Sequence, residues 1–300
     1  MRKDISFKVK GLTCHGWFFR PDNVPADKKL PVIVQCTGFG GVKEFILGPY
    51  AELHASRGFC SLAFDYRFTG ASEGEPRGQV IPAFQHDDIR CAISCALEQE
   101  GVDQNKLILW GCSYGGAHAM FLGAIDHRVK AVVSIVPGVG PRELVDQGQR
   151  KMWDSFWRRI TSEFLASAKS AEEPTIPIVA PKGELCLFPQ DHCYDWIFTN
   201  ASRAPNWRNA VTLESRLRAM EYFPAAYIDL ISPRPFLMFA TENDSLVQPE
   251  TLKAAFARAK EPKRFELFPG THFGLYDPGP RRDKVVEITH EWLSQHGLEP

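Results

Sequence analysis

Short apolar runs recur along the chain and alternate with segments of helical periodicity. Residues 5–9 and 12–19 predict two strands joined by a turn at Gly11. Residues 30–35 (LPVIVQ) form a continuous apolar, β-branched run, which is typical of a strand buried on both faces of a parallel sheet. Further strands are expected at 59–65, 106–111, 130–136, 235–240 and 264–268, and helices at 44–57, 82–100, 114–125, 249–260 and 283–296. This alternation indicates parallel βαβ units, and therefore an α/β fold with a doubly wound, mostly parallel sheet.

Residues 141–229 interrupt the alternation. They contain helical stretches, no convincing run of parallel strands, and four of the seven tryptophans: Trp153, Trp157, Trp196 and Trp207. We predict a core formed by residues 1–140 and 230–300, with 141–229 as a mostly helical cap over the carboxyl edge of the sheet, where ligands bind in open α/β folds. Trp153, Trp157 and Trp196, together with Phe273, are expected to line a hydrophobic pocket. The alternative is that these aromatic residues form only the core of the cap.

Composition narrows the class of protein. The chain has 300 residues, 44% hydrophobic and 24% charged, with a net charge of −1, which is typical of a globular protein and unlike a nucleic-acid binder that relies on a basic field. The first residues lack the apolar stretch of a signal peptide, and no apolar run is long enough to span a membrane, so a cytoplasmic location is expected. The eight cysteines include no CxxC pair, which favours reduced thiols and no structural zinc or other metal site.

The sharpest chemical signal is Gly111-Cys112-Ser113-Tyr114-Gly115. It matches G-x-S-x-G, follows a buried strand and opens a helix, which is the context that a nucleophile elbow requires. The turn is so sharp that flanking side chains would clash, which explains the glycines. It would present the Ser113 hydroxyl above the sheet near the positive end of the following helix. We therefore predict Ser113 as a nucleophile.

A serine nucleophile needs a base and an acid that orients the base. In this architecture the chain order is Ser, then Asp or Glu, then His. Asp244 follows the strand at 235–240, and His272 lies in the loop after the strand at 264–268. We favour Asp244 as the acid over the nearby Glu242, and assign His272 as the base. The other histidines are expected at the surface or in structural roles, with His192 as a weaker pocket candidate.

Acyl transfer also needs donors for the developing oxyanion. The backbone N–H of Tyr114, directly after the nucleophile, is one expected donor. The loop Cys36-Thr37-Gly38-Phe39-Gly40-Gly41 follows the strand at 30–35, and its glycines would let the backbone approach a substrate closely. We assign the second donor to the backbone N–H of Phe39. A plain strand-to-helix turn is the alternative.

These residues together resemble the α/β-hydrolase superfamily across nearly the full length of the chain. The Gly-rich loop, Asp65-Tyr66-Arg67, the elbow, ENDSLV at 242–247 and GTHFG at 270–274 occur in the usual order. More narrowly, GFGGVKEF at 38–45 and WGCSYGG at 110–116 are similar to the fungal group named after the fumagillin polyketide transferase. That group includes acyltransferases and thiohydrolases of polyketide pathways. One departure is Thr37, because many relatives carry histidine there.

The motifs and the resemblance predict covalent acyl transfer through Ser113, His272 and Asp244, with no cofactor or metal. The resemblance implies a hydrophobic acyl or polyketide-type ester or thioester as a small-molecule substrate, with delivery by a synthase as one option. A homodimer is compatible with the sequence, which does not fix the oligomeric state. The alternatives are a cyclisation or lyase step in the same pocket, a receptor without turnover, and a peptidase. Epoxide hydrolases and dehalogenases are disfavoured because they use aspartate at the elbow.

Overall fold

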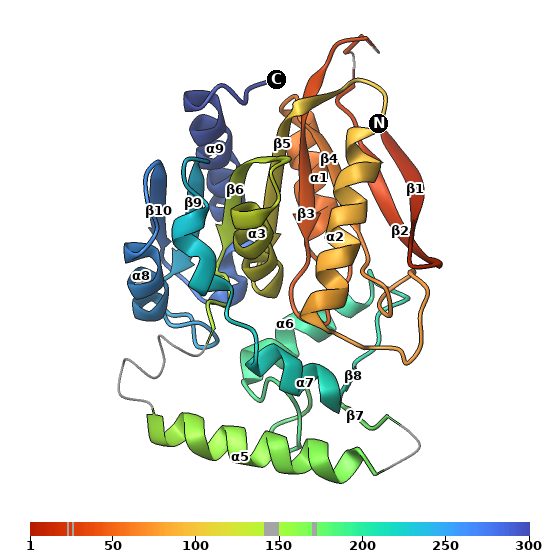
Figure 1. The fold of residues 1–300 in the computed structure, drawn as a ribbon, viewed down its shortest axis with the longest axis vertical. Helices are drawn as coiled ribbons and strands as arrows, with labels where there is room; N and C mark the ends of the chain where they lie inside the picture. Colours follow the sequence, from red (N-terminus) through yellow and green to blue (C-terminus); the bar gives the residue numbers. More distant parts are fainter. Residues whose placement is uncertain (23, 26, 141–149, 170–172) are drawn as a thin grey trace.

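An eight-stranded sheet forms the centre of the computed structural model, which describes residues 1–22, 24–25, 27–140, 150–169 and 173–300 (Figure 1). The strand order is β1-β2-β4-β3-β5-β6-β9-β10. The pairs β1–β2 and β2–β4 are antiparallel, and the remaining neighbours are parallel. The predicted mostly parallel α/β architecture is confirmed.

The strands lie close to their predicted positions. Every residue of β3, β4 and β9 is buried, as expected for β-branched and aromatic runs covered on both faces. The strands are β1 (Arg2–Val9), β2 (Leu12–Phe19), β3 (Leu30–Cys36), β4 (Cys60–Phe64), β5 (Val102–Cys112), β6 (Val129–Ile135), β9 (Phe236–Thr241) and β10 (Lys263–Phe268).

Helices cover both faces of the sheet, and an apolar core lies on each face. Helices α1 (Leu47–Ser56) and α9 (Pro280–Gln295) pack on one face. Helices α2 (Pro82–Leu97), α3 (Tyr114–Ile125) and α8 (Pro249–Ala257) pack on the other. Proline stands at the start of α2, α8 and α9, where its missing N–H breaks no helical hydrogen bond.

Between β6 and β9 the regular structure of the described residues is mostly helical. It contains α5 (Arg150–Ser167), α6 (Asp191–Ala201), α7 (Leu213–Met220) and the 3₁₀ helix η2 (Pro224–Leu230). Two short strands that the sequence did not predict, β7 (Thr175–Ile176) and β8 (Val211–Thr212), pair antiparallel. Helices α5, α6 and α7 gather beyond one end of the sheet (Figure 1), whereas η2 packs against α3. The division into core and cap at 141 and 229 stays a prediction.

All eight cysteines fall within the described residues and are free thiols, six of them buried. Within the same part of the chain, no helix combines the length and apolar character needed to cross a membrane.

Candidate active site

Ser113 occupies the turn between β5 and α3, and its backbone has φ 51° and ψ −120°. A non-glycine residue with positive φ is strained, and such strain persists only where the surroundings hold it. Here the Ser113 N–H donates to Ile135 O at 2.8 Å, and the Ser113 carbonyl accepts from Ala117 N and Gly138 N, both at 3.2 Å. The turn is thus fixed from β6 and from the first turn of α3.

The glycines around Ser113 are sterically required. A Cβ on Gly111 would overlap the backbone of Gly115, and a Cβ on Gly115 would overlap the carbonyl of Cys36. The end of β3 therefore packs directly against the start of α3. The G-x-S-x-G pattern was predicted to need glycines because flanking side chains would clash, and this close approach is that clash.

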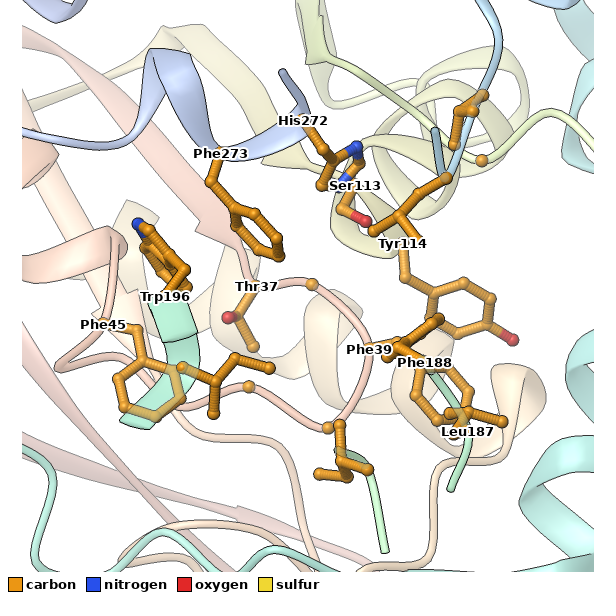
Figure 2. Close-up of a pocket in the computed structure, with 18 of the residues that line it drawn as sticks. Thr37, Phe39, Phe45, Ser113, Tyr114, Leu187, Phe188, Trp196, His272 and Phe273 are labelled. Carbon is orange, nitrogen blue, oxygen red and sulfur yellow. The ribbon is translucent and has the colours of Figure 1, made fainter. Parts of the chain in front are cut away.

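His272 and Asp244 form a buried pair next to Ser113. The His272 Nδ1 atom lies 2.7 Å from Asp244 Oδ2, and both side chains are almost fully shielded from solvent. The other carboxylate oxygen, Oδ1, accepts the backbone N–H groups of Leu246 and Val247 at 2.8 and 2.9 Å. Figure 2 shows the His272 ring beside the Ser113 hydroxyl. The alternative acid, Glu242, is exposed.

The Gly-rich loop after β3 runs along the same turn. A Cβ on Gly38 would lie 3.3 Å from the Ser113 Cβ, so the loop backbone approaches the serine closely. The Phe39 ring packs edge-on against Tyr114, with ring centroids 5.1 Å apart. These contacts bring together the two residues whose backbone N–H groups were predicted as oxyanion donors. That role stays a prediction.

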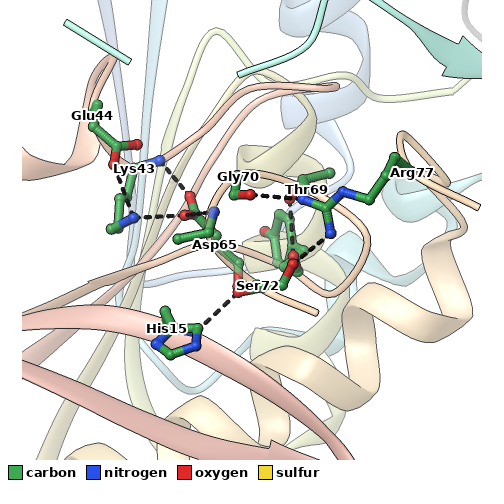
Figure 3. A network of polar contacts seen from close by, with 10 residues as sticks. His15, Lys43, Glu44, Asp65, Thr69, Gly70, Ser72 and Arg77 are labelled. Atoms are coloured by element: carbon green, nitrogen blue, oxygen red, sulfur yellow. Dashed lines mark hydrogen bonds and ion pairs between the residues drawn. The ribbon is translucent and has the colours of Figure 1, made fainter. Parts of the chain in front are cut away.

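A buried ion pair joins the residues after this loop to the end of β4. Asp65, at the end of β4, accepts the backbone N–H of Lys43 at 2.8 Å and the Lys43 ammonium at 2.6 Å (Figure 3). Glu44 accepts the same ammonium at 2.9 Å. Burial alone would lower the Lys43 pKa, but the two carboxylates outweigh that effect and raise it. A Cβ on Gly70 would overlap the Asp65 carboxylate, which accounts for glycine there.

Ser113 and His272 open into a cavity of about 400 Å³ with a largely apolar wall. This volume falls in the range of small-molecule sites. Its aromatic lining residues come from the chain between β3 and α1, from the start of α3, from the segment between β6 and β9, and from the chain between β10 and α9: Phe39, Phe45, Tyr114, Phe188, Trp196, Trp207, Phe273 and Tyr276. Figure 2 shows Phe39, Tyr114 and Phe188 on one side of the cavity and Phe45, Trp196 and Phe273 on the other. The cavity can therefore hold a hydrophobic group next to the serine.

Two of the predicted wall residues meet in the cavity. Trp196 on α6 and Phe273 stack with ring centroids 4.6 Å apart, and both line the wall. Trp157 lies on α5 and is not part of this wall. The side chain of Trp153 falls outside the described residues. His192 lies next to the cavity residue Ser245, with 3.2 Å between Nε2 and Oγ.

Sequence reasoning missed one important wall residue, Trp207. It follows α6, and its indole Nε1–H donates to the carbonyl of Gly40 at 3.1 Å, so it touches the Gly-rich loop itself. Trp207 was visible as one of the four tryptophans of this region, but the sequence holds no signal that separates it from Trp157.

Comparisons with known proteins show the family and the fold. A family model described as the alpha/beta hydrolase fold matches residues 31–278. The polyketide transferase ATR5 of Stachybotrys chlorohalonatus is 29% identical over 271 residues, which cover 89% of this chain and 88% of that protein. A thiohydrolase of Eupenicillium brefeldianum is 26% identical over 275 residues, with coverage of 90% and 86%.

A solved structure is also similar over almost the whole chain. DcsB, in a complex with its substrate analogue, superposes with a TM-score of 0.81 at 26% sequence identity. The match covers 98% of this chain and 99% of the DcsB chain, so it includes the segment between β6 and β9 as well as the sheet.

Proposed function

This chain belongs to the alpha/beta hydrolase family, and from that premise we propose that it is a serine enzyme that transfers or hydrolyses a hydrophobic acyl group. The substrate is an ester or thioester of the polyketide type. The similarity to a polyketide transferase and to a thiohydrolase supports this substrate class.

One observation carries the proposal. Ser113 stands on a strained turn beside the His272–Asp244 pair, and the serine opens into an apolar cavity of about 400 Å³. A serine, a histidine and an acid in this relation are the parts of a covalent acyl-transfer mechanism. The Asp244 carboxylate accepts one hydrogen bond from the imidazole and two from backbone N–H groups, so it can hold the ring in one tautomer.

In the first half-reaction, the Ser113 oxygen attacks the carbonyl carbon while its proton passes to His272 Nε2. The backbone N–H groups of Phe39 and Tyr114 stabilise the negative oxygen of the tetrahedral intermediate. The carbon–sulfur or carbon–oxygen bond of the substrate then breaks, and the leaving thiol or alcohol takes the proton from His272. The product is an acyl ester on Ser113.

In the second half-reaction, water or an acceptor alcohol attacks the acyl ester. His272 removes the proton of the attacking oxygen, and the same two N–H groups stabilise the second tetrahedral intermediate. When the ester bond breaks, Ser113 recovers its proton from His272. The aromatic wall favours a hydrophobic acyl group, because each apolar contact removes surface from water.

Intact-protein mass spectrometry tests this proposal. We would mix the protein with a medium-chain acyl thioester and look for an adduct of one acyl mass. The adduct should form in the wild type, disappear in Ser113→Ala, and remain in Ser245→Ala, which removes a second serine of the same cavity. Measuring products in water and in the presence of alcohols then separates hydrolysis from transfer.

The alternative is a cyclisation or lyase step that uses the cavity without a serine ester. In that case Ser113→Ala still turns over the polyketide-like metabolite that binds in the cavity, and a serine-directed phosphonate leaves the wild-type mass unchanged. Either result would refute the covalent mechanism.

A further inference from the structure

Two histidines that the proposed mechanism does not use face each other between α2 and α3. His118 on α3 and His86 on α2 approach each other with 3.1 Å between His118 Nδ1 and His86 Nε2. The hydroxyl of Tyr222, two residues beyond the end of α7, lies 3.0 Å from His86 Nε2 and 3.2 Å from His118 Nδ1. The cluster thus joins the segment after α7 to two helices of the core.

The protonation of this cluster follows from its partners. His118 Nε2 lies 2.8 Å from the side-chain oxygen of Gln85, so this nitrogen carries the hydrogen and Nδ1 is an acceptor. Burial lowers the pKa of His118, and it lowers that of His86 to about 3, so both rings are neutral near pH 7. The Tyr222 hydroxyl can then accept from His86 Nε2–H, and its own hydrogen has two acceptors in reach, His118 Nδ1 and the carbonyl of Ala117 at 3.3 Å, so the cluster needs no charge.

Helix α7 is attached to the core at its other end as well. The hydroxyl of Ser215, in the first turn of α7, accepts the backbone N–H of Val80 at 2.7 Å. The Thr212 side chain caps the same end by accepting the Ser215 N–H. Ala219 and Met220, in the last turn of α7, line the cavity. The last turn of α7 is therefore a piece of cavity wall held next to the Tyr222 contact.

We propose that Tyr222 is a positioning residue: by fixing the end of α7 on His86 and His118, its hydroxyl sets the depth of the acyl-binding part of the cavity. This inference rests on the proposed function, because it concerns the acyl substrate of that site. Tyr222 itself does not act on the reacting atoms. Its loss changes how well a long acyl group binds, and it leaves the reactivity of Ser113 unchanged.

Steady-state kinetics with acyl thioesters of two lengths provide the test. Tyr222→Phe should raise KM for a decanoyl thioester about five- to tenfold, the effect of losing one buried hydrogen bond. Its kcat should stay within about threefold of the wild type, and its KM for an acetyl thioester should not change, because a short acyl group does not reach α7. Tyr227→Phe, on η2 of the same segment, is the matched control and should behave as the wild type.

A second pair of variants separates the hydrogen bond from general packing. His86→Gln keeps an N–H donor and should retain the wild-type KM, whereas His86→Leu should raise KM as Tyr222→Phe does. Equal effects on both thioesters, or an equal loss of kcat and of phosphonate labelling at Ser113, would overturn the inference. An unchanged KM in Tyr222→Phe would overturn it too.

Hydrogen exchange keeps the two proposals distinguishable. If the wild type neither turns over a thioester nor reacts with a phosphonate, the proposed function fails. The backbone amides of α7 should still exchange faster in Tyr222→Phe than in Tyr227→Phe, and equal rates would show that Tyr222 does not hold the helix.

Discussion

Both oxygens of the Asp244 carboxylate accept hydrogen bonds. Oδ2 lies against the His272 ring, and Oδ1 accepts two backbone N–H groups. An ionised carboxylate only accepts hydrogen bonds, and every partner here is a donor. This matching explains why the acid of the pair is Asp244 and why an amide cannot replace it without reversing one contact.

We therefore expect Asp244→Asn to lower kcat for an acyl thioester on the order of 10³- to 10⁴-fold, because the imidazole would be held in the wrong tautomer. Glu242→Gln changes an exposed carboxylate and should keep kcat within about twofold. Both variants would be compared by initial rates at saturating substrate. A larger loss in Glu242→Gln than in Asp244→Asn would contradict the assignment of the acid.

The space around the glycines near Ser113 predicts how two Gly→Ala substitutions change the free energy of unfolding. Gly115→Ala forces a Cβ into the Cys36 carbonyl, and we expect it to lower the free energy of unfolding by about 3 kcal/mol or more. Gly138→Ala, also near the serine, has open space around its Cβ and should change stability by less than about 1 kcal/mol. Urea unfolding of the two variants and the wild type measures both values.

A site residue can be predicted from the sequence when its role is tied to a motif. Ser113, Asp244 and His272 stand at the ends of strands, where the chain order fixes their neighbours, and the structure brings them together. Trp157 and Trp207 carry no such constraint. Which tryptophan faces the cavity depends on how α5 and α6 pack, and helix packing is not encoded in local periodicity.

At the scale of elements, the Gly-rich loop depends on β4. The Lys43–Asp65 pair joins the residues after the loop to the end of that strand, and both side chains are almost fully buried. Removing one partner of a buried ion pair leaves the other charge without compensation, which costs more than the pair contributes.

Asp65→Ala should accordingly lower the free energy of unfolding by about 3–5 kcal/mol. The control is Lys10→Ala, which breaks a surface pair with Asp87 at a similar distance of 2.8 Å and should cost less than about 1 kcal/mol. Chemical denaturation reports both changes. Similar losses in the two variants would mean that burial does not set the strength of the Lys43–Asp65 pair.

Six strands of the sheet could be predicted to within one residue because their apolar runs match burial in the sheet. Strands β1 and β5 begin three and four residues earlier than predicted, in polar stretches that carry no strand pattern. The segment between β6 and β9 was harder. Its helical character was predictable, but β7 and β8 are two residues each, too short to leave an alternation in the sequence. These two strands form only where they pair with each other, and more than 30 residues separate them in the sequence.

On the scale of the whole molecule, the two faces of the sheet each hold a pair of histidines. His86 and His118 lie on the side of α2 and α3, whereas His54 and His290 lie between α1 and α9, with 2.9 Å between their ring nitrogens. Burial lowers the pKa of all four below the ordinary value of 6.5. The folded protein therefore keeps these rings neutral in mildly acidic solution.

This arrangement predicts acid sensitivity. Below pH 6.5 the unfolded chain binds protons that the folded chain does not, so the free energy of unfolding falls as the pH drops from about 6.5 toward 3. Each such histidine contributes a slope of up to about 1.4 kcal/mol per pH unit. His290→Gln should reduce the slope by roughly that amount when urea unfolding is measured between about pH 6 and 5. An unchanged slope would show that His290 is protonated equally in both states.

The hydrogen bond from Trp207 to the Gly40 carbonyl has a consequence for anyone who would engineer this protein. It makes the segment after α6 a structural partner of the loop beside Ser113, so the two cannot be exchanged as separate modules. Grafting the segment between β6 and β9 from a relative would bring new specificity only if the matching loop came with it. Deleting this segment would remove a support of the loop along with part of the cavity wall.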